Sequence, residues 1–311
     1  MVKLIFLLSL IVQQSGQPDH LTIYSEEQLI AEVSRVEFME PLLPDTPLID
    51  LEKVDFLMKD IEQQVYQQPI DARIDINGNI IPEEPGYSLN KQAFQNLFYS
   101  YFYSNKAASV NVPRQVLHPR VDSELLSQVR TKLLGQYVTF FNSQNKERSQ
   151  NISLSAEAIN NYVVFPGETF SFNKVVGKRT AERGYLPAPV IVKGELTEGI
   201  GGGICQVSST LYNAVDRSGV QIVERYSHSK RVPYVPPGRD ATVSWYGPDF
   251  TFKNSYNQPI LIQARKLGGK LAIFIYSSED VNYQPRKIPS ASRTLPEEVE
   301  SGSNIKQPKQ Q

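Results

Sequence analysis

GGGICQVSSTLYNAVDRSGVQIVERYSHS, residues 201 to 229, contains Cys205, the one cysteine in a chain of 311 residues. After Cys205, apolar residues recur at the spacing of one helix face, and Gly219 is a suitable residue to end a helix. We therefore predict a main helix that begins near Cys205. Its apolar face is formed by Val207, Leu211, Ala214 and Val215.

Three glycines, Gly201, Gly202 and Gly203, precede this helix. Glycines allow a backbone to approach a ligand closely, and the first turn of a helix presents free N–H groups. The helix dipole favours the thiolate of a cysteine at this position, and a neighbouring imidazole would lower the thiol pKa further. These features suit a ligand site better than a core.

Cys205 is followed along the chain by His228, just after a predicted strand, and by Asp240, at the start of the next predicted strand. A cysteine on a helix with His and Asp on neighbouring strands is the order that a nucleophilic Cys-His-Asp site requires. In this hypothesis Cys205 is the nucleophile, His228 the base and Asp240 the residue that orients the base. The Gln206 side chain or a backbone N–H at the helix start would stabilise an oxyanion.

Other interpretations of the same residues stay open. Cys205 can be a small buried apolar residue beside a loop histidine, and Arg225 can pair with Asp240 to hold two segments together. In a non-catalytic protein, the glycine loop and nearby polar or aromatic side chains would contact glycan or peptide. The candidate binding residues are Gly201, Gly202, Gly203, Gln206, Tyr212, Arg225 and Arg239.

The composition excludes several classes of protein. With 32 basic and 33 acidic residues the net charge is −1, so no overall positive field points to nucleic acid. The three histidines are isolated from one another and from Cys205, and no motif with metal-ligand spacing occurs. Glycine-rich nucleotide motifs are also missing, so we expect no metal, no cofactor and no nucleic acid partner.

The two ends of the chain have compositions unlike the middle. Lys3 and the apolar run 4–12 predict a signal peptide or N-terminal anchor over 1–18, too short to span a bilayer as a mature helix. We therefore expect an extracytoplasmic protein, secreted or wall-associated and peripheral to the membrane at most. Proline-rich residues 19–47 are predicted to be a linker, and residues 283–311, which lack apolar periodicity, a disordered tail.

The middle of the chain predicts an α+β fold in two modules. Residues 48–135 give the order helix, hairpin, helix, strand and helix, with the hairpin turn at Asn77-Gly78. Residues 136–282 contain short β-prone runs around the main helix near Cys205. We therefore expect a small helix/hairpin module followed by a β-rich domain.

Several blocks in the second module also form a recognisable set. They are NNYVVFPGETFSFN at 160–173, VVGKRT at 175–180, GGGICQVSSTLY at 201–212, ERYSHS at 224–229 and YVPPGRDATV at 234–243. In this order they resemble the VanW family, named for an accessory protein of vancomycin-resistance clusters. The first module, with PGYSLN at 85–90, resembles the YoaR-like domain that often precedes VanW and is thought to bind peptidoglycan or act in cell-wall maturation.

The resemblance implies a Gram-positive bacterium, export, and peptidoglycan or its precursors as partner. It implies a role in cell-wall maturation or in the response to glycopeptide antibiotics, but no particular reaction. One hypothesis is a Cys-His-Asp acyl-transfer or amidase-like enzyme. The alternative is a non-catalytic peptidoglycan-binding or envelope assembly protein, so the sequence leaves open whether the chain is an enzyme.

Overall fold

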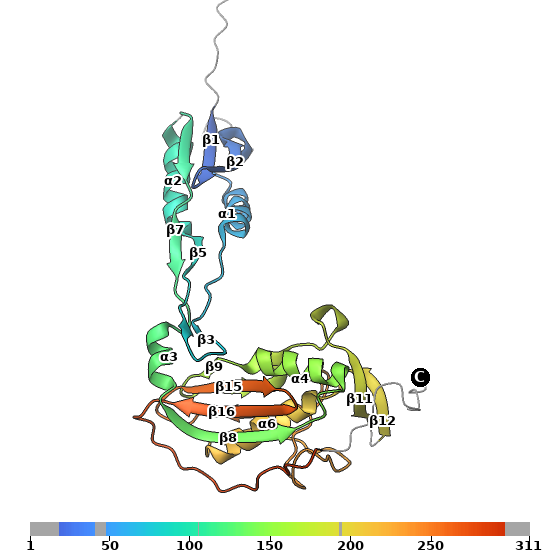
Figure 1. Cartoon of the computed structure of the whole chain (residues 1–311). Coiled ribbons are helices and arrows are strands. Elements are labelled where there is room, and N and C mark those ends of the chain that lie inside the picture. Colours follow the sequence, from blue (N-terminus) through green and yellow to red (C-terminus); the bar gives the residue numbers. More distant parts are fainter. Residues whose placement is uncertain (1–18, 41–47, 105, 193–194, 296–311) are drawn as a thin grey trace, which may run out of the picture. The chain divides into compact units, whose positions relative to one another are not determined.

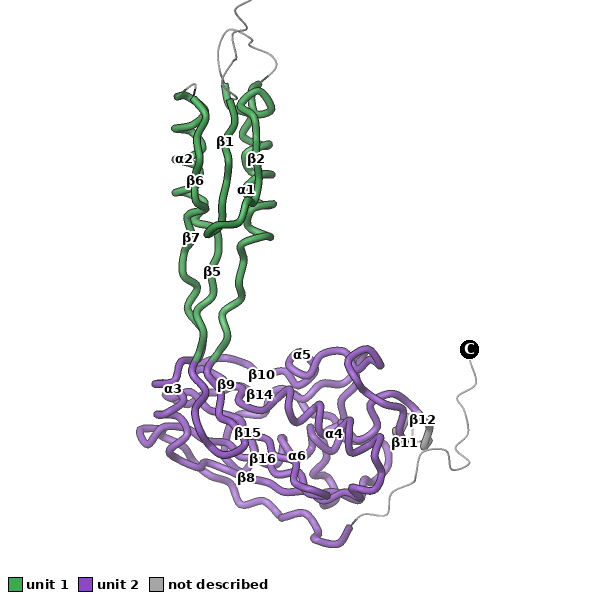
Figure 2. Tube along the Cα trace, turned by 45° about the horizontal axis from the view of Figure 1, so that its top comes forward, with its two compact units in different colours: residues 1–71, 83–120 green, residues 72–82, 121–311 purple. Residues whose placement is uncertain are grey.

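The computed structural model describes residues 19–40, 48–104, 106–192 and 195–295, which form the α+β fold that the sequence predicts (Figure 1). The chain divides into two compact units, residues 1–71 with 83–120 and residues 72–82 with 121–311 (Figure 2). The signal peptide or anchor predicted for 1–18 lies outside the described residues.

The first unit combines a three-stranded sheet with two helices. Strand β1 pairs with β2 in an antiparallel manner and with β6 in a parallel manner, and β5 pairs with β7. Buried aromatic side chains of α2, including Phe94, Phe98 and Phe102, form the centre of its core. The elements are β1 His20–Ser25, β2 Gln28–Ser34, η1 Arg35–Phe38, α1 Leu51–Val65, β5 Gly86–Leu89, α2 Lys91–Ser104, β6 Ala108–Asn111 and β7 Arg114–Leu117.

The linker predicted over 19–47 is instead ordered β structure in its described part, residues 19–40. Leu21 and Ile23 alternate with more exposed residues along β1 and are fully buried, which gives the strand one core-facing side. The prolines that suggested a linker come after this hairpin, and the pairing of β1 with the distant β6 has no local signal.

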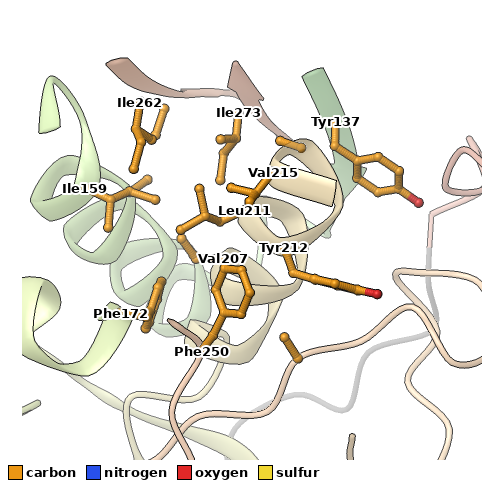
Figure 3. Close-up of a cluster of buried hydrophobic side chains, with 14 of the residues drawn as sticks. Tyr137, Ile159, Phe172, Val207, Leu211, Tyr212, Val215, Phe250, Ile262 and Ile273 are labelled. Carbon is orange, nitrogen blue, oxygen red and sulfur yellow. The ribbon is translucent and has the colours of Figure 1, made fainter. Parts of the chain in front are cut away.

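The second unit is built around helix α6. A four-stranded antiparallel sheet, in the order β8-β16-β15-β9, packs against α4 and α6, and a three-stranded sheet, β10-β14-β13, lies nearby. Figure 3 shows Leu211 of α6 facing Ile262 and Ile273 of the larger sheet, while Phe172 and Phe250 lie on another side of the helix. Helix α6 is therefore central to the core.

The bounds of these elements are as follows. They are β3 Arg73–Ile74, β4 Ile80–Ile81, α3 Ser123–Val129, β8 Lys132–Phe140, α4 Lys146–Ile159, β9 Tyr162–Val164, β10 Thr169–Ser171, α5 Phe172–Val176, η2 Ala181–Arg183, β11 Pro187–Val192, β12 Glu195–Ile200, α6 Ile204–Arg217, β13 Gln221–Glu224, β14 Thr251–Lys253, β15 Ile260–Leu267 and β16 Lys270–Ser277. Helix α6 begins one residue before the predicted start at Cys205.

The hairpin at Asn77-Gly78 forms as predicted, but it groups with the second unit. The Ile74 N–H donates to Asn161 Oδ1 at 3.0 Å, and Asn161 Nδ2 donates to the Ile74 carbonyl at 3.1 Å. The predicted module 48–135 thus contains segments of both units. Its boundary as an independently folding domain stays a prediction.

Part of the predicted disordered tail makes defined contacts. The Tyr137 hydroxyl donates to the Pro289 carbonyl at 3.1 Å, and Arg217 Nη2 donates to the Ile288 carbonyl at 3.0 Å. Residues 283–295 therefore run along the second unit without regular secondary structure, and 296–311 lie outside the described residues.

Helix α6 is buried around almost its whole circumference, not along a single apolar face. Its polar side chains are buried because each finds a partner inside the unit. Thr210 Oγ1 lies 2.8 Å from Thr139 Oγ1 of β8, and Asn213 Nδ2 donates to the Arg239 carbonyl at 2.7 Å. The buried polar residues of α6 are Gln206, Ser208, Ser209, Thr210, Asn213 and Asp216.

We predict that Gly135→Ala destabilises the chain, because β8 and α6 touch at Gly135. A Cβ atom there would lie 2.6 Å from the Ala214 carbonyl oxygen and 2.8 Å from the Ser218 nitrogen. The free energy of unfolding should fall by about 1–3 kcal/mol in urea titrations of the full chain. Leu133→Ala, at a position 40% exposed on the same strand, should cost less than about 1 kcal/mol. Equal losses would contradict this close approach.

Candidate functional site

Three predicted residues, Cys205, His228 and Asp240, come together beside the first turn of α6. His228 lies in the loop after β13, and its Nδ1 is 2.7 Å from Asp240 Oδ2. The His228 backbone N–H donates to the same carboxylate oxygen at 2.6 Å. The two side chains are only 6% and 9% exposed, so the carboxylate fixes both the backbone and the ring of His228.

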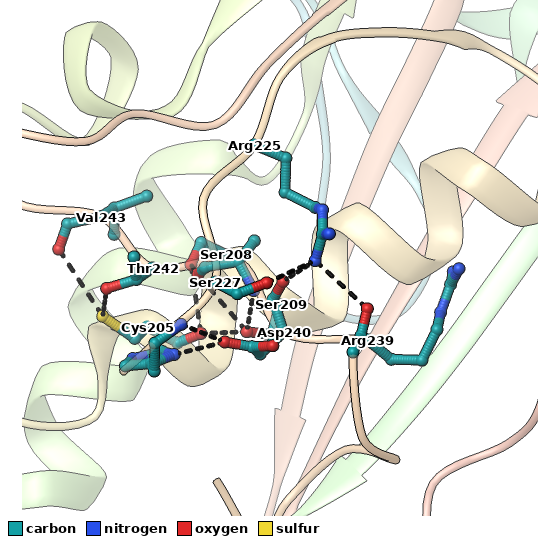
Figure 4. Close-up of polar contacts among 12 residues, drawn as sticks. Cys205, Ser208, Ser209, Arg225, Ser227, Arg239, Asp240, Thr242 and Val243 are labelled. Atoms are coloured by element: carbon teal, nitrogen blue, oxygen red, sulfur yellow. Dashed lines mark hydrogen bonds and ion pairs between the residues drawn. The ribbon is translucent and has the colours of Figure 1, made fainter. Parts of the chain in front are cut away.

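The environment of Cys205 is mixed, since the residue is neither fully buried nor exposed. Its Sγ lies 3.8 Å from Thr242 Oγ1 and 3.6 Å from the Val243 carbonyl oxygen (Figure 4). The protonated thiol donates to that carbonyl, because a carbonyl oxygen only accepts. This contact orients the sulfur in the neutral state.

The charges of the three residues are coupled. Burial opposes ionisation of Cys205, but a hydrogen bond and positive charge from His228 outweigh it, so the thiol pKa lies below its usual range. Burial also disfavours the charged form of His228, but hydrogen bonds with Asp240 and Cys205 raise its pKa to about 9. Despite burial, hydrogen bonds from His228 hold the Asp240 pKa below its usual value. Together these shifts favour a thiolate–imidazolium pair at neutral pH.

The ionised Asp240 determines which His228 nitrogen can act on the sulfur. A carboxylate only accepts hydrogen bonds, so Nδ1 carries the proton at the 2.7 Å contact. Nε2 is then the ring atom left to exchange a proton with Cys205. This is the division of roles that a nucleophilic Cys-His-Asp site requires.

Helix α6 itself holds the segment that carries Asp240. Ser208 Oγ donates to the Ala241 carbonyl at 2.5 Å, and the Ala241 N–H donates to Ser209 Oγ at 2.9 Å. One residue further, Thr242 forms a bridge with Tyr226. The strand predicted to begin at Asp240 is therefore reduced to this bridge, because much of the hydrogen bonding of this segment goes to a helix and not to a sheet.

Arg225 supports the same segment, although not by the ion pair considered from the sequence. Its Nη1 donates to the backbone carbonyl of Asp240 at 2.6 Å, to that of Gly238 at 3.2 Å and to Ser227 Oγ at 3.2 Å (Figure 4). The Asp240 carboxylate is thus left for His228. Arg225 therefore stabilises the conformation of this loop by hydrogen bonds to its backbone.

Tyr212 and Arg239, two of the predicted binding residues, make contacts within the unit. Tyr212 is 7% exposed, and its ring centroid lies 4.9 Å from the guanidinium carbon of Arg225 and 4.6 Å from that of Arg239. Arg239 also donates to Asn213 Oδ1 at 2.8 Å and to Asp216 Oδ2 at 2.7 Å. Stacked and paired groups of this kind stabilise the fold and leave little surface for a ligand.

Gln206 is fully buried, and both ends of its amide are occupied. Its Oε1 accepts from Arg148 Nη2 at 2.7 Å, and its Nε2 donates to Thr139 Oγ1 at 3.1 Å and to the Phe140 carbonyl at 3.0 Å. The side chain therefore has no donor left for an oxyanion. Within the described residues, the Cys205 backbone N–H donates to no backbone oxygen, so this group remains the candidate donor.

The three glycines have structural reasons to be glycine. Gly201 and Gly203 adopt φ values of 94° and 106°, which favour glycine. A Cβ on Gly202 would lie 2.7 Å from the Ala188 backbone of β11. The turn is thus shaped by backbone conformation and close packing, and it delivers Cys205 to the start of α6.

Sequence reasoning missed three side chains around the thiol: Arg148, Arg179 and Tyr234. Burial raises the pKa of Tyr234, and the nearby Cys205 adds to this, so the phenol stays neutral. The Arg148 guanidinium carbon lies 6.0 Å from the Tyr234 ring centroid. Arg148 is on α4, which lacked a clear apolar period, but Arg179 lies within the VVGKRT block noted in the sequence.

The described residues contain neither a cluster of metal ligands nor a helix that could span a membrane. In residues 19–40, 48–104, 106–192 and 195–295, no three or more His, Cys, Asp or Glu side chains gather to hold a metal ion. Helices in these same ranges all lack the length and apolar character needed to cross a membrane.

Comparison with known proteins identifies two family models. The model described as "VanW like protein" matches residues 147–276, and the one described as "Putative peptidoglycan binding domain" matches residues 28–100. The latter begins within the segment predicted to be a linker. No solved structure matches the chain.

Two relatives are similar in sequence. "Uncharacterized protein YoaR" of Bacillus subtilis (strain 168) is 57% identical over 292 residues, which cover 94% of this chain and 96% of that protein. "Vancomycin B-type resistance protein VanW" of Enterococcus faecalis (strain ATCC 700802 / V583) is 32% identical over 99 residues, or 30% of this chain and 36% of that protein.

The lowered thiol pKa can be tested by alkylation. We predict that the rate of Cys205 alkylation by iodoacetamide rises with pH at a midpoint below about 8.5, the pKa of a free cysteine. His228→Ala removes the stabilising cation while burial remains, so the midpoint should move above that value. The rate at pH 7 should then fall at least about tenfold, the effect of one pKa unit.

His118→Ala, at an exposed position in the first unit, is the matched control and should leave the profile unchanged. A profile that is insensitive to His228→Ala would show that the imidazole does not act on the sulfur.

Proposed function

We propose that this chain, which belongs to the VanW-like family, is a cysteine-dependent acyl-transfer or amidase-like enzyme acting on peptidoglycan peptides. Its family and its match to a peptidoglycan-binding model support a cell-wall-related role, with peptidoglycan as a partner. The enzymatic part of the proposal rests on one observation. The buried Asp240 carboxylate fixes His228 next to Cys205, the charge arrangement that activates a thiol.

In the first step, the Cys205 thiolate attacks the carbonyl carbon of an amide. A C–S bond forms while the carbonyl π electrons move to oxygen, and the Cys205 N–H would donate to this oxyanion. When the carbonyl re-forms, the C–N bond breaks and the protonated His228 gives its proton to the departing amine. The products are a thioester on Cys205, a free amine and neutral His228.

In the second step, an amine or water attacks the thioester. Neutral His228 takes the proton of the incoming nucleophile, the C–S bond breaks, and the sulfur leaves as a thiolate beside the imidazolium. An amine acceptor gives a new amide and therefore acyl transfer, whereas water gives a carboxylic acid and therefore hydrolysis. Throughout the cycle Asp240 keeps Nδ1 protonated, so Nε2 handles every transferred proton.

Export forms part of the proposal. Lys3 and the apolar run 4–12 predict a leader, and peptidoglycan as a partner suggests a location in the cell wall. The name of the VanW relative refers to vancomycin resistance, so a role in the glycopeptide response is proposed for this chain too. Fractionation of the producing cells would overturn export if all of the full-length protein were cytosolic.

A second candidate is a protein that binds peptidoglycan without catalysis. Exposed aromatic side chains favour it, since Trp245 is 41% and Tyr246 86% exposed, and such rings stack on sugars. Both residues closely follow Val243, whose carbonyl contacts the Cys205 thiol. In this candidate the thiol is dispensable, so binding to insoluble cell walls would persist in Cys205→Ser.

The enzyme proposal is tested by incubating the full chain with a purified muropeptide mixture. We expect released or exchanged amines and an acyl adduct on Cys205, both detected by mass spectrometry. Cys205→Ser should lose all measurable turnover, and Asp240→Asn should lose about 10⁴-fold, because the histidine would adopt the wrong tautomer. Cys205→Ser should still fold, since the side-chain volume hardly changes.

The matched control is Ser229→Ala, an exposed neighbour of His228, which should retain full turnover. Turnover that survives Cys205→Ser would exclude the thiol as nucleophile. Cell-wall binding without turnover in the native chain would favour the second candidate.

A further inference from the structure

Arg179, in the loop between α5 and η2, carries a cationic group whose hydrogen bonding is incomplete. Its Nη2 donates to Asn173 Oδ1 at 2.8 Å, and its guanidinium carbon lies 5.8 Å from the Phe172 ring centroid. Its Nη1 is buried and has no hydrogen-bond partner within the described residues. A buried donor left without a partner is costly, so such a group requires an explanation.

Arg225 and Arg239 differ from Arg179 in this respect. Arg239 is paired with Asp216, and Arg225 Nη1 donates to three oxygens, so both guanidinium groups hold parts of the fold together. For Arg179, no carboxylate within ion-pair distance is found in the part of the chain that the structure describes. Its guanidinium therefore has no direct ion pair with a carboxylate in this part of the chain.

Arg179 is held next to the thiol by two independent contacts. A Cβ on Gly201 would lie 3.5 Å from the Arg179 Cβ and 3.6 Å from its Cγ, so the stem of Arg179 lies against the turn that precedes Cys205. On the other side, Asn173 Nδ2 donates to the Ser244 carbonyl at 2.9 Å, directly after Val243. Asn173 thus links the guanidinium to the loop that contacts the sulfur.

The electrostatics agree with this placement. Burial lowers the pKa of Arg179, while Tyr185, Cys205 and Asp249 act in the opposite direction. A guanidinium stays charged at any physiological pH even when its pKa is lowered. A fixed positive charge shielded from bulk water discriminates strongly between an anion and a neutral group.

We infer that Arg179 is a specificity-determining residue that binds a carboxylate of the molecule processed at Cys205. The inference rests on the proposed function and names its substrate class: acyl donors or acceptors that carry a free carboxylate near the reacting carbonyl. The unused Nη1 donor supplies the hydrogen bond, and the guanidinium supplies the charge. A substrate whose carboxylate is blocked as an amide loses both.

The test compares two small alkylating probes that differ in charge, iodoacetate and iodoacetamide. In Arg179→Gln, we expect the ratio of the Cys205 alkylation rates, iodoacetate over iodoacetamide, to fall about tenfold, the scale of one charge-assisted hydrogen bond. The ratio isolates anion binding, because a change in the thiol pKa alters the thiolate fraction and therefore changes both alkylation rates by the same factor. Arg179→Lys should keep part of the preference.

The matched control is Lys178→Gln. It removes the same charge from the adjacent position, where the Lys178 nitrogen lies 5.6 Å from the centroid of the exposed Tyr246 ring. Its ratio should equal that of the unmodified chain. A ratio that does not respond to Arg179→Gln, or that responds equally to Lys178→Gln, would overturn the inference while leaving the proposed nucleophile intact.

A second measurement needs no reactive thiol. In the Cys205→Ser chain, N-acetyl-D-alanine should raise the melting temperature, because a ligand that binds the folded state stabilises it. Its neutral amide should not, and Arg179→Gln in the same background should abolish the shift. If native Cys205 reacts with neither probe, the proposed function fails. In that case a melting shift that requires Arg179 would still support the inference, and its absence would overturn it.

Discussion

The near-complete burial of helix α6 is the constraint on which the second unit depends. A buried serine, threonine, asparagine or glutamine costs free energy unless it is hydrogen-bonded, and α6 carries several of them. Ser208 and Ser209 meet this requirement through Ala241, and Asn213 does so through the Arg239 carbonyl. The chain from 239 to 241 must therefore lie along α6, and Asp240 is brought near the thiol as a result.

The surroundings of the thiol separate two accounts of the lone cysteine. An inert core cysteine would have apolar neighbours, and burial alone would raise its pKa. Here the neighbouring imidazole reverses that effect, because His228 is itself held protonated by the Asp240 carboxylate. The carboxylate in turn is free to do this because Arg225 takes the Asp240 carbonyl instead. The contacts thus run from Arg225 through Asp240 and His228 to the sulfur.

Local signals predicted much of this arrangement. The N-caps of α1 and α2 depend on such local signals, since the Asp50 and Asn90 side chains accept from the Lys53 and Ala93 N–H groups at 3.1 and 3.0 Å. The order of Cys205, His228 and Asp240 along the chain was also visible, since it needs only the sequence. Helix α4 carries only a weak signal in the sequence, because half of its buried positions are polar and conceal the apolar period.

Non-local partners account for what the sequence left unpredicted. Tyr212 looked like a surface aromatic, but two arginines from a later loop enclose it. Gln206 looked like a free amide, but β8 and α4 occupy both its ends. The sequence marked Arg179 only as part of a motif block. Its proposed role depends on the turn that its side chain lies against, and the sequence does not reveal that contact. Spacing along a chain contains no information on such contacts.

The sequence distance between Cys205, His228 and Asp240 has a consequence for the life of the protein. None of the contacts that lower the thiol pKa exists in an unfolded chain, because loops of many residues must close before the imidazole meets the sulfur. During synthesis, Cys205 is then an ordinary thiol that is largely protonated at neutral pH. The heightened nucleophilicity would switch on only when folding is complete, which protects the nascent chain from unwanted modification.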